Sequence, residues 1–141
     1  MLGSGKSERT ALCCGETEMV LDTNILIYSA QLGGEHLLPW IEDSKAIVSI
    51  VSRIEALGFP GLTVEEEAAI KGALQSLPEI GLTEAVAGRA IFLRQERKMG
   101  LVDAVIAATA LVLEVPLVTR NVDDFKHLAR LRLIDPFAAE C

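Results

Sequence analysis

The sequence has 141 residues, of which half are hydrophobic and only 4% aromatic, and its formal net charge is −7. This length suits one domain with a core of Leu, Ile, Val and Ala, and such a core favours helices packed on a sheet over an aromatic-rich all-β fold. The acidic charge argues against the general phosphate attraction of a basic nucleic-acid-binding protein. Bound divalent cations would weaken that objection.

The N-terminal segment differs in composition from the rest of the chain. Residues 1–18 are mostly small or polar and show no hydrophobic period, so we expect a flexible tail there and a single domain over residues 19–141. The tail contains GSGKS, but it lacks the upstream glycine and the preceding strand of a phosphate-binding loop. Nucleotide binding at this segment is therefore not expected.

Cysteine usage and hydropathy indicate the compartment. Cys13 and Cys14 are adjacent and Cys141 is distant, which is neither a disulfide framework nor a metal-binding spacing. We therefore expect a reducing, cytoplasmic environment. The longest apolar region, residues 101–118, is interrupted by two acids and a proline, so a buried helix followed by a strand is expected there and no membrane span.

Short apolar runs alternate with helical patterns in the first half of the chain. Residues 20–22 are apolar up to the final Asp22, residues 46–51 are apolar except for Ser49, and both segments are predicted to be buried strands. Between them, residues 25–32 and 35–44 are predicted to be short helices, separated by a pair of glycines. Ser52 is then expected to cap a helix that ends at a glycine.

The second half continues this alternation. Thr63 and Thr83 each precede a helical pattern and are expected to be helix N-caps. Residues 101–114 are almost wholly apolar, which predicts a helix buried among other elements. Residues 117–119 and 131–134 are predicted to be short strands. Strands that alternate with helices indicate a parallel sheet with helices on both faces.

Four acidic positions follow strands or begin helices: Asp22, Glu55, Asp103, and Asp123 or Asp124. Ligands of open α/β sheets bind along the edge where such residues lie. Grouped carboxylates raise one another's pKa, and Mg²⁺ or Mn²⁺ would remove that cost and activate a water. Each acid also has a simpler explanation as a cap or as a partner of a helix dipole. Asp103 is the strongest candidate, because a carboxylate in an apolar helix needs a partner or a cleft.

Four segments taken together resemble a known family: MVLDTNILIYS, SRIEAL, VDAVIAATA and LVTRNVDDF are similar to the motifs of the PIN domain, particularly the VapC type of bacterial toxin. The resemblance extends over residues 19–137. It implies a three-layer α/β/α domain with a short central parallel sheet and a Mg²⁺- or Mn²⁺-dependent ribonuclease site. It also implies that Asp22, Glu55 and Asp103 bind the metal, that tRNA, rRNA or mRNA is the substrate, and that the protein forms a homodimer bound by a cognate antitoxin.

The sequence departs from the family pattern in the last segment. Asn121 stands where many members have Asp, so it can position a water through its carbonyl but adds no charge. We expect Asp124 rather than Asp123 to be the fourth metal-binding and catalytic acid, with Asp123 in a supporting role. Thr23 and Asn24 are expected to orient the first carboxylate, as hydrogen bonds behind metal ligands often do.

Basic residues precede the third acid. Arg94 shares a helix flank with Arg97 and Lys98, and this flank runs towards Asp103. A solvated helix face is the simplest interpretation of these charges. The alternative is contact with RNA phosphates, and under that hypothesis the RNA-binding residues are Arg94, Arg97, Lys98 and Arg120.

Two other functions are also compatible with the residues. An aspartyl-phosphate phosphatase of the haloacid dehalogenase type also begins with a strand ending in Asp, but it needs a second Asp two residues later, where this sequence has Asn24. The other is a non-catalytic binding module that keeps the fold. The acidic charge and the substitution at Asn121 keep this second alternative open.

Overall fold

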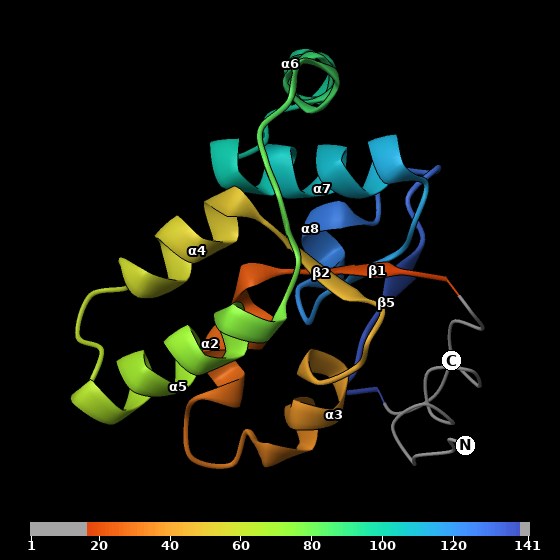
Figure 1. The fold of residues 1–141 in the computed structure, drawn as a ribbon. Helices are drawn as coiled ribbons and strands as arrows, with labels where there is room; N and C mark the ends of the chain where they lie inside the picture. The colour runs from red at the N-terminus through yellow and green to blue at the C-terminus, as the bar shows by residue number, and fades with distance from the viewer. Residues whose placement is uncertain (1–16, 139–141) are drawn as a thin grey trace.

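The computed structural model describes residues 17–138 (Figure 1). The tail predicted over residues 1–18, with its GSGKS and its cysteine pair, lies outside the described residues except for its last two positions. Within the described part, parallel strands form one sheet in the order β3-β2-β1-β4-β5. The strands are β1 (Met19–Leu21), β2 (Ala46–Ser49), β3 (Glu79–Ile80), β4 (Leu117–Val118) and β5 (Leu133–Ile134).

Helices cover both faces of this sheet. They are α2 (Thr23–Ser29), the 3-10 turn η1 (Glu35–Leu37), α3 (Leu38–Ile41), α4 (Ile50–Leu57), α5 (Val64–Ser76), α6 (Glu84–Glu96), α7 (Leu101–Leu113) and α8 (Val122–Phe125). In Figure 1, α6 and α7 lie above the sheet, whereas α2, α3 and α5 lie below it. None of the described helices is long and apolar enough to cross a membrane.

Two apolar layers form the core, one on each face of the sheet. Successive strand residues point to opposite faces: Met19 and Leu21 pack with α2, α3 and α5, while Val20 packs with α6, α7 and α8. The same alternation places Val48 in the first layer and Ile47 in the second. The predicted three-layer α/β/α fold with a short parallel sheet is confirmed.

The start of α4 differs from the prediction. Ser49 Oγ accepts a hydrogen bond from the backbone N–H of Val51 at 3.2 Å, so Ser49 is the cap and the helix begins at Ile50. Ser52, the predicted cap, lies buried inside the helix. The β-branched pair after Ser49 favours a strand on propensity alone, but the cap and the packing of the helix override that preference.

Other elements match the prediction in part. Residues 35–44 form η1 and α3 rather than one helix, with Pro39 in the first turn of α3, where its missing N–H costs nothing. Strand β3 was not predicted, because its two residues show no readable alternation. The predicted caps Thr63 and Thr83 are confirmed, and Thr63 forms a reciprocal capping box with Glu66.

The strand order positions the site. The chain leaves β1 to build β2 and β3 on one side, and it later returns to build β4 and β5 on the other side. The carboxyl end of β1 is therefore the point where the order of the parallel strands reverses, and ligands of open α/β sheets bind at such points. Asp22 is the first residue after β1.

Candidate active site

Asp22 is held by hydrogen bonds at both carboxylate oxygens. Its Oδ1 accepts from the backbone N–H of Thr23 at 2.8 Å, which makes Asp22 the N-cap of α2. Its Oδ2 accepts from Thr119 Oγ1 at 2.7 Å. Asp22 is only 4% exposed, so these contacts fix the carboxylate at the edge of the sheet.

Thr119 was not predicted to belong to the site. It follows β4 directly and is fully buried, and its Oγ1 also accepts a hydrogen bond from the backbone N–H of Asn121 at 3.0 Å. One hydroxyl thus joins Asp22 to the loop that leads into α8. The only signal in the sequence is a hydroxyl at the carboxyl end of a strand. That signal becomes informative once β4 is known to lie beside β1.

Thr23 and Ser52 connect α2, which Asp22 caps, to α4, which carries Glu55. Thr23 orients Asp22 through its backbone N–H, while its hydroxyl donates to Ser52 Oγ at 2.9 Å, 29 residues away. Ser52 lies three residues before Glu55 on α4, about one helical turn. The bond between the two hydroxyls therefore fixes α4, and with it Glu55, relative to Asp22. Asn24 Oδ1 is buried, and it accepts no hydrogen bond from any described residue.

The other acids lie near Asp22 but are more accessible to solvent. Glu55 is exposed on α4, Asp103 is half-buried in the first turn of α7, and Asp124 is exposed on α8. The pKa of Asp22 is raised to about 6. Burial is the largest cause, and repulsion from Asp103 and Glu55 acts in the same direction, while the hydrogen bonds from Thr119 and Thr23 lower it. Asp22 therefore interacts electrostatically with two of the other predicted acids, Asp103 and Glu55.

Asp103 joins the remaining acid to this group. Its pKa is raised first by burial, then by repulsion from Asp124 and from Glu55. Together with the repulsion at Asp22, these interactions make one electrostatically coupled group of four carboxylates, which we call the acid cluster: Asp22, Glu55, Asp103 and Asp124. Its members come from the ends of β1 and from α4, α7 and α8.

The two neighbouring acids on α8 have different surroundings. Asp123 Oδ1 lies 3.0 Å from Lys126 Nζ, and its side chain is 86% exposed. Asp124 instead acts on Asp103, and it forms no ion pair with another described residue. The structure thus brings Asp124 into the acid cluster and leaves Asp123 in solvent. Asn121 is exposed at the start of α8, where its side chain makes no capping hydrogen bond.

The four basic residues predicted to bind RNA do not form one surface. Arg120 follows Thr119, and its guanidinium lies 4.2 Å from the centroid of the Phe137 ring. Arg94 Nε donates to the backbone carbonyl of Met99 at 3.0 Å. Arg94 and Lys98 line a cavity of about 560 Å³ between α6 and α7. Arg97 instead lies near His127, whose pKa falls because of burial and then because of this arginine.

Comparison with known proteins identifies the family. The PIN domain family model matches residues 19–131. The chain belongs to the PIN domain family. No curated protein sequence is significantly similar to this PIN domain.

Several solved structures share its fold. A toxin–antitoxin complex from Klebsiella pneumoniae is 29% identical, with a TM-score of 0.68 over 84% of this chain and 98% of that chain. DNA-bound VapBC from Salmonella typhimurium is 20% identical, with a TM-score of 0.71 over 85% and 98% of the two chains. VapBC-1 from nontypeable Haemophilus influenzae is 22% identical, with a TM-score of 0.68 over 86% and 99%.

The donor chemistry of this PIN domain fits a hard divalent cation. The acid cluster consists of carboxylate oxygens, and within residues 17–138 no Lys or Arg forms an ion pair with any of its members. The four like charges therefore lack a compensating cation from the described chain. Within residues 17–138 no three Asp, Glu, His or Cys side chains lie close enough together to hold a metal ion. A bound divalent cation would compensate the like charges of the acid cluster.

Proposed function

We propose that this PIN domain is a metal-dependent endoribonuclease and the toxin of a type II toxin–antitoxin pair. One observation carries the proposal: Asp22 is buried at the strand-order reversal, between the hydroxyl of Thr119 and the N–H of Thr23, within electrostatic reach of Asp103 and Glu55. A buried, uncompensated carboxylate is costly, and sites that bear such a cost are commonly functional. Several solved structures with this fold come from toxin–antitoxin complexes.

Under this proposal the acid cluster holds Mg²⁺ or Mn²⁺. The chemistry that such an ion supplies when bound is activation of a water and neutralisation of charge on the scissile phosphate. Asp22 contributes a carboxylate that is already oriented, because both of its oxygens are hydrogen-bonded. Glu55 and Asp124 are exposed, so they can adjust to the ion and the substrate without disturbing the core. Asp103 is half-buried at the start of α7, and both Glu55 and Asp124 raise its pKa.

The proposal includes partners and a location. A cognate antitoxin is proposed because solved structures with this fold include a toxin–antitoxin complex and a member of the VapBC family of toxin–antitoxin systems. A homodimer is supported by Leu82, Ile91 and Leu101, which are 55%, 59% and 62% exposed around one cavity. Ile91→Glu should therefore give a monomer by light scattering, and a dimer of unchanged mass would exclude this face. The unpaired cysteine spacing supports a cytoplasmic location.

A cleavage assay tests the proposed activity. The purified full chain is incubated with total RNA in Mg²⁺ or in EDTA, and the fragment ends are sequenced to identify the RNA that is cut. Asp103→Asn should abolish Mg²⁺-dependent cleavage. Asp123→Asn is the matched control and should cleave like the wild type, because Asp123 pairs with Lys126 in solvent. Cleavage by Asp103→Asn at the wild-type rate would contradict the proposal.

The alternatives make different predictions. Membership of the PIN family argues against the aspartyl-phosphate phosphatase, which needs an acid where this chain has Asn24. A non-catalytic binding module predicts no cleavage of any RNA and no increase in melting temperature with Mn²⁺. A chain that neither cleaves RNA nor melts at a higher temperature with Mn²⁺ would be such a module.

A further inference from the structure

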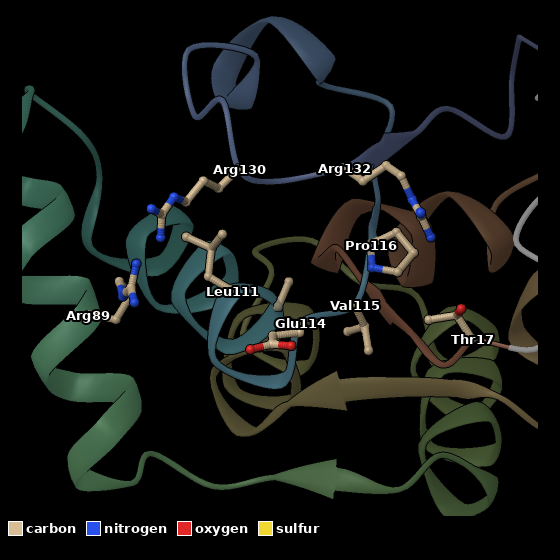
Figure 2. Close-up of a pocket in the computed structure, with 9 residues that line it drawn as sticks. Thr17, Arg89, Leu111, Glu114, Val115, Pro116, Arg130 and Arg132 are labelled. Atoms are coloured by element: carbon tan, nitrogen blue, oxygen red, sulfur yellow. The ribbon is translucent and has the colours of Figure 1, made fainter.

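Two arginines line three neighbouring cavities near the carboxyl-terminal end of α7. Arg89 on α6 and Arg130 in the loop before β5 both line a cavity of about 510 Å³ (Figure 2). The same two residues also line adjoining cavities of about 780 Å³ and 330 Å³. In Figure 2 their guanidinium groups lie on the same side of the first cavity, while Arg132 lies on the other side of Pro116. We call the three joined cavities the arginine groove.

The two arginines have no anionic partner in the described part of the chain. Neither Arg89 nor Arg130 forms an ion pair or a hydrogen bond with another residue in the range 17–138. Glu114 lines the first cavity, and its backbone lies in the left-handed region at φ 59°, but its carboxylate is not paired with either arginine. Glu84 and Glu96 each line one of the other two cavities. Two facing cations that the fold holds together attract an anion from outside.

Charge is distributed unevenly along this acidic chain. Residues 17–83 contain three Lys and Arg against ten Asp and Glu, whereas residues 84–138 contain eight against seven. Apart from Thr17, the residues that line the arginine groove come from the second of these ranges. A polyanion is therefore directed to this face and repelled by much of the remaining surface.

An exposed aromatic ring lies beside the arginines. Phe92 is 51% exposed and lines two of the three cavities, next to Arg89 and Arg130 in both. Basic grooves with an exposed aromatic ring are typical of single-strand nucleic-acid binding, because the cations contact phosphates and the ring stacks on a base. Leu111 and Val115 add apolar walls to the first cavity. Arg89, Arg130 and Phe92 thus supply both kinds of contact.

The groove is separate from the acid cluster. Glu114, the C-cap residue of α7 that lines the first cavity, lies eleven residues after Asp103, about 16 Å along the helix axis at 1.5 Å per residue. At about 3.4 Å per stacked nucleotide, this distance corresponds to about five nucleotides. An RNA shorter than that, bound at the acid cluster, does not reach the arginines.

We propose that Arg89, Arg130 and Phe92 bind single-stranded RNA outside the acid cluster, through phosphate contacts and base stacking. This inference rests on the proposed ribonuclease function for its account of the bound strand. The surface is distinct from the cavity of Arg94 and Lys98, whereas Arg97 lines the smallest of its three cavities. Under this proposal, the length of the RNA affects the affinity with which the protein binds it.

Binding without catalysis provides the first test. Fluorescence anisotropy of a labelled RNA of about 14 nucleotides in EDTA should show binding by the wild type, and at least about fivefold weaker binding by Phe92→Ala. Arg89→Ala and Arg130→Ala should each reduce the slope of log affinity against log salt by about 1. Lys71→Ala is the control, because Lys71 pairs with Glu67 on the acidic part of the surface. No binding by the wild type, or unchanged binding by these variants, would overturn the proposal.

Substrate length provides the second test. With Mg²⁺, Arg130→Ala should raise KM for the RNA of about 14 nucleotides and leave cleavage of one of about four nucleotides unchanged. Equal losses on both lengths would indicate damage to the fold or the acid cluster and would overturn the assignment. Displacement of the RNA by inorganic phosphate or by polyglutamate at equal anion concentration would assign the groove to free anions or to an acidic protein segment. RNA binding in EDTA without cleavage in Mg²⁺ would keep the groove and refute the ribonuclease.

Discussion

Asp22→Asn tests whether the buried carboxylate lowers the free energy of unfolding of the metal-free protein. The pKa of Asp22 is raised from its ordinary value of 3.8 to about 6, so the folded state binds the proton more tightly than the unfolded chain does. The stability contributed by this proton is fully present below about pH 4 and is lost as the pH rises through about 6. A shift of about 2 units corresponds to roughly 3 kcal/mol at 1.36 kcal/mol per unit.

The asparagine variant removes this charge and keeps the shape of the side chain. Its Oδ1 can still accept from the N–H of Thr23, and its amide can donate to Thr119 Oγ1, since a hydroxyl both donates and accepts. Weaker hydrogen bonds offset about 1 kcal/mol of the gain. In EDTA at about pH 8, Asp22→Asn should therefore be about 2 kcal/mol more stable than the wild type.

Urea unfolding in EDTA at two pH values measures this difference. The gain of Asp22→Asn at about pH 8 should largely disappear at about pH 4, where wild-type Asp22 is protonated. Asp123→Asn is the control for loss of a surface charge, and its stability should differ from that of the wild type by less than about 0.5 kcal/mol. Equal destabilisation by Asp22→Asn at both pH values would refute the reasoning, because it would show that the carboxylate stabilises the fold.

Three further changes test separate parts of the structure. Thr119→Val removes the donor to Asp22 Oδ2, so its free energy of unfolding in urea should fall by roughly 1.5–3 kcal/mol at about pH 8 and by less at about pH 4. Thr119→Ser keeps a hydroxyl and should have a near wild-type free energy of unfolding. Thr63→Ala breaks the capping box of α5 and should lower the free energy of unfolding by about 1 kcal/mol at either pH. A loss that depends on pH would show that this cap interacts with the acid cluster. Ile106→Ala creates a cavity between α7 and the sheet and should cost roughly 2–5 kcal/mol, whereas Ile54→Ala, at a residue 68% exposed, should cost far less; equal losses would contradict the assigned core.

The fold is largely predictable from sequence because two signals coincide. The strands β1, β2 and β4 are apolar on both faces, as buried parallel strands must be, and each is followed by a helical pattern. The exact start of α4 is not predictable, because Ser49 and Ser52 are both good caps around a β-branched pair. Only packing decides between them, and it buries Ser52 against Thr23.

The acid cluster is predictable in outline for a topological reason. Carboxyl ends of parallel strands share one edge of the sheet, so Asp22, Glu55 and the acids of α8 are expected there as soon as the strands are recognised. Thr119 is not predictable from sequence, because its contact with Asp22 depends on β4 lying beside β1 rather than beside β5 alone. The proximity of Arg89 and Arg130 is even harder to predict from the sequence. The two residues are 41 positions apart and meet only through the packing of helices and loops.

Mn²⁺ binding tests most directly the claim that the four carboxylates form one metal centre. Electron paramagnetic resonance counts free Mn²⁺ as the ion is titrated into the full chain after EDTA is removed. The wild type should bind the ion, Asp103→Asn should bind it at least about tenfold more weakly, and Asp123→Asn should match the wild type. Equal affinities for the wild type and Asp103→Asn, or no binding by the wild type at millimolar Mn²⁺, would contradict the account.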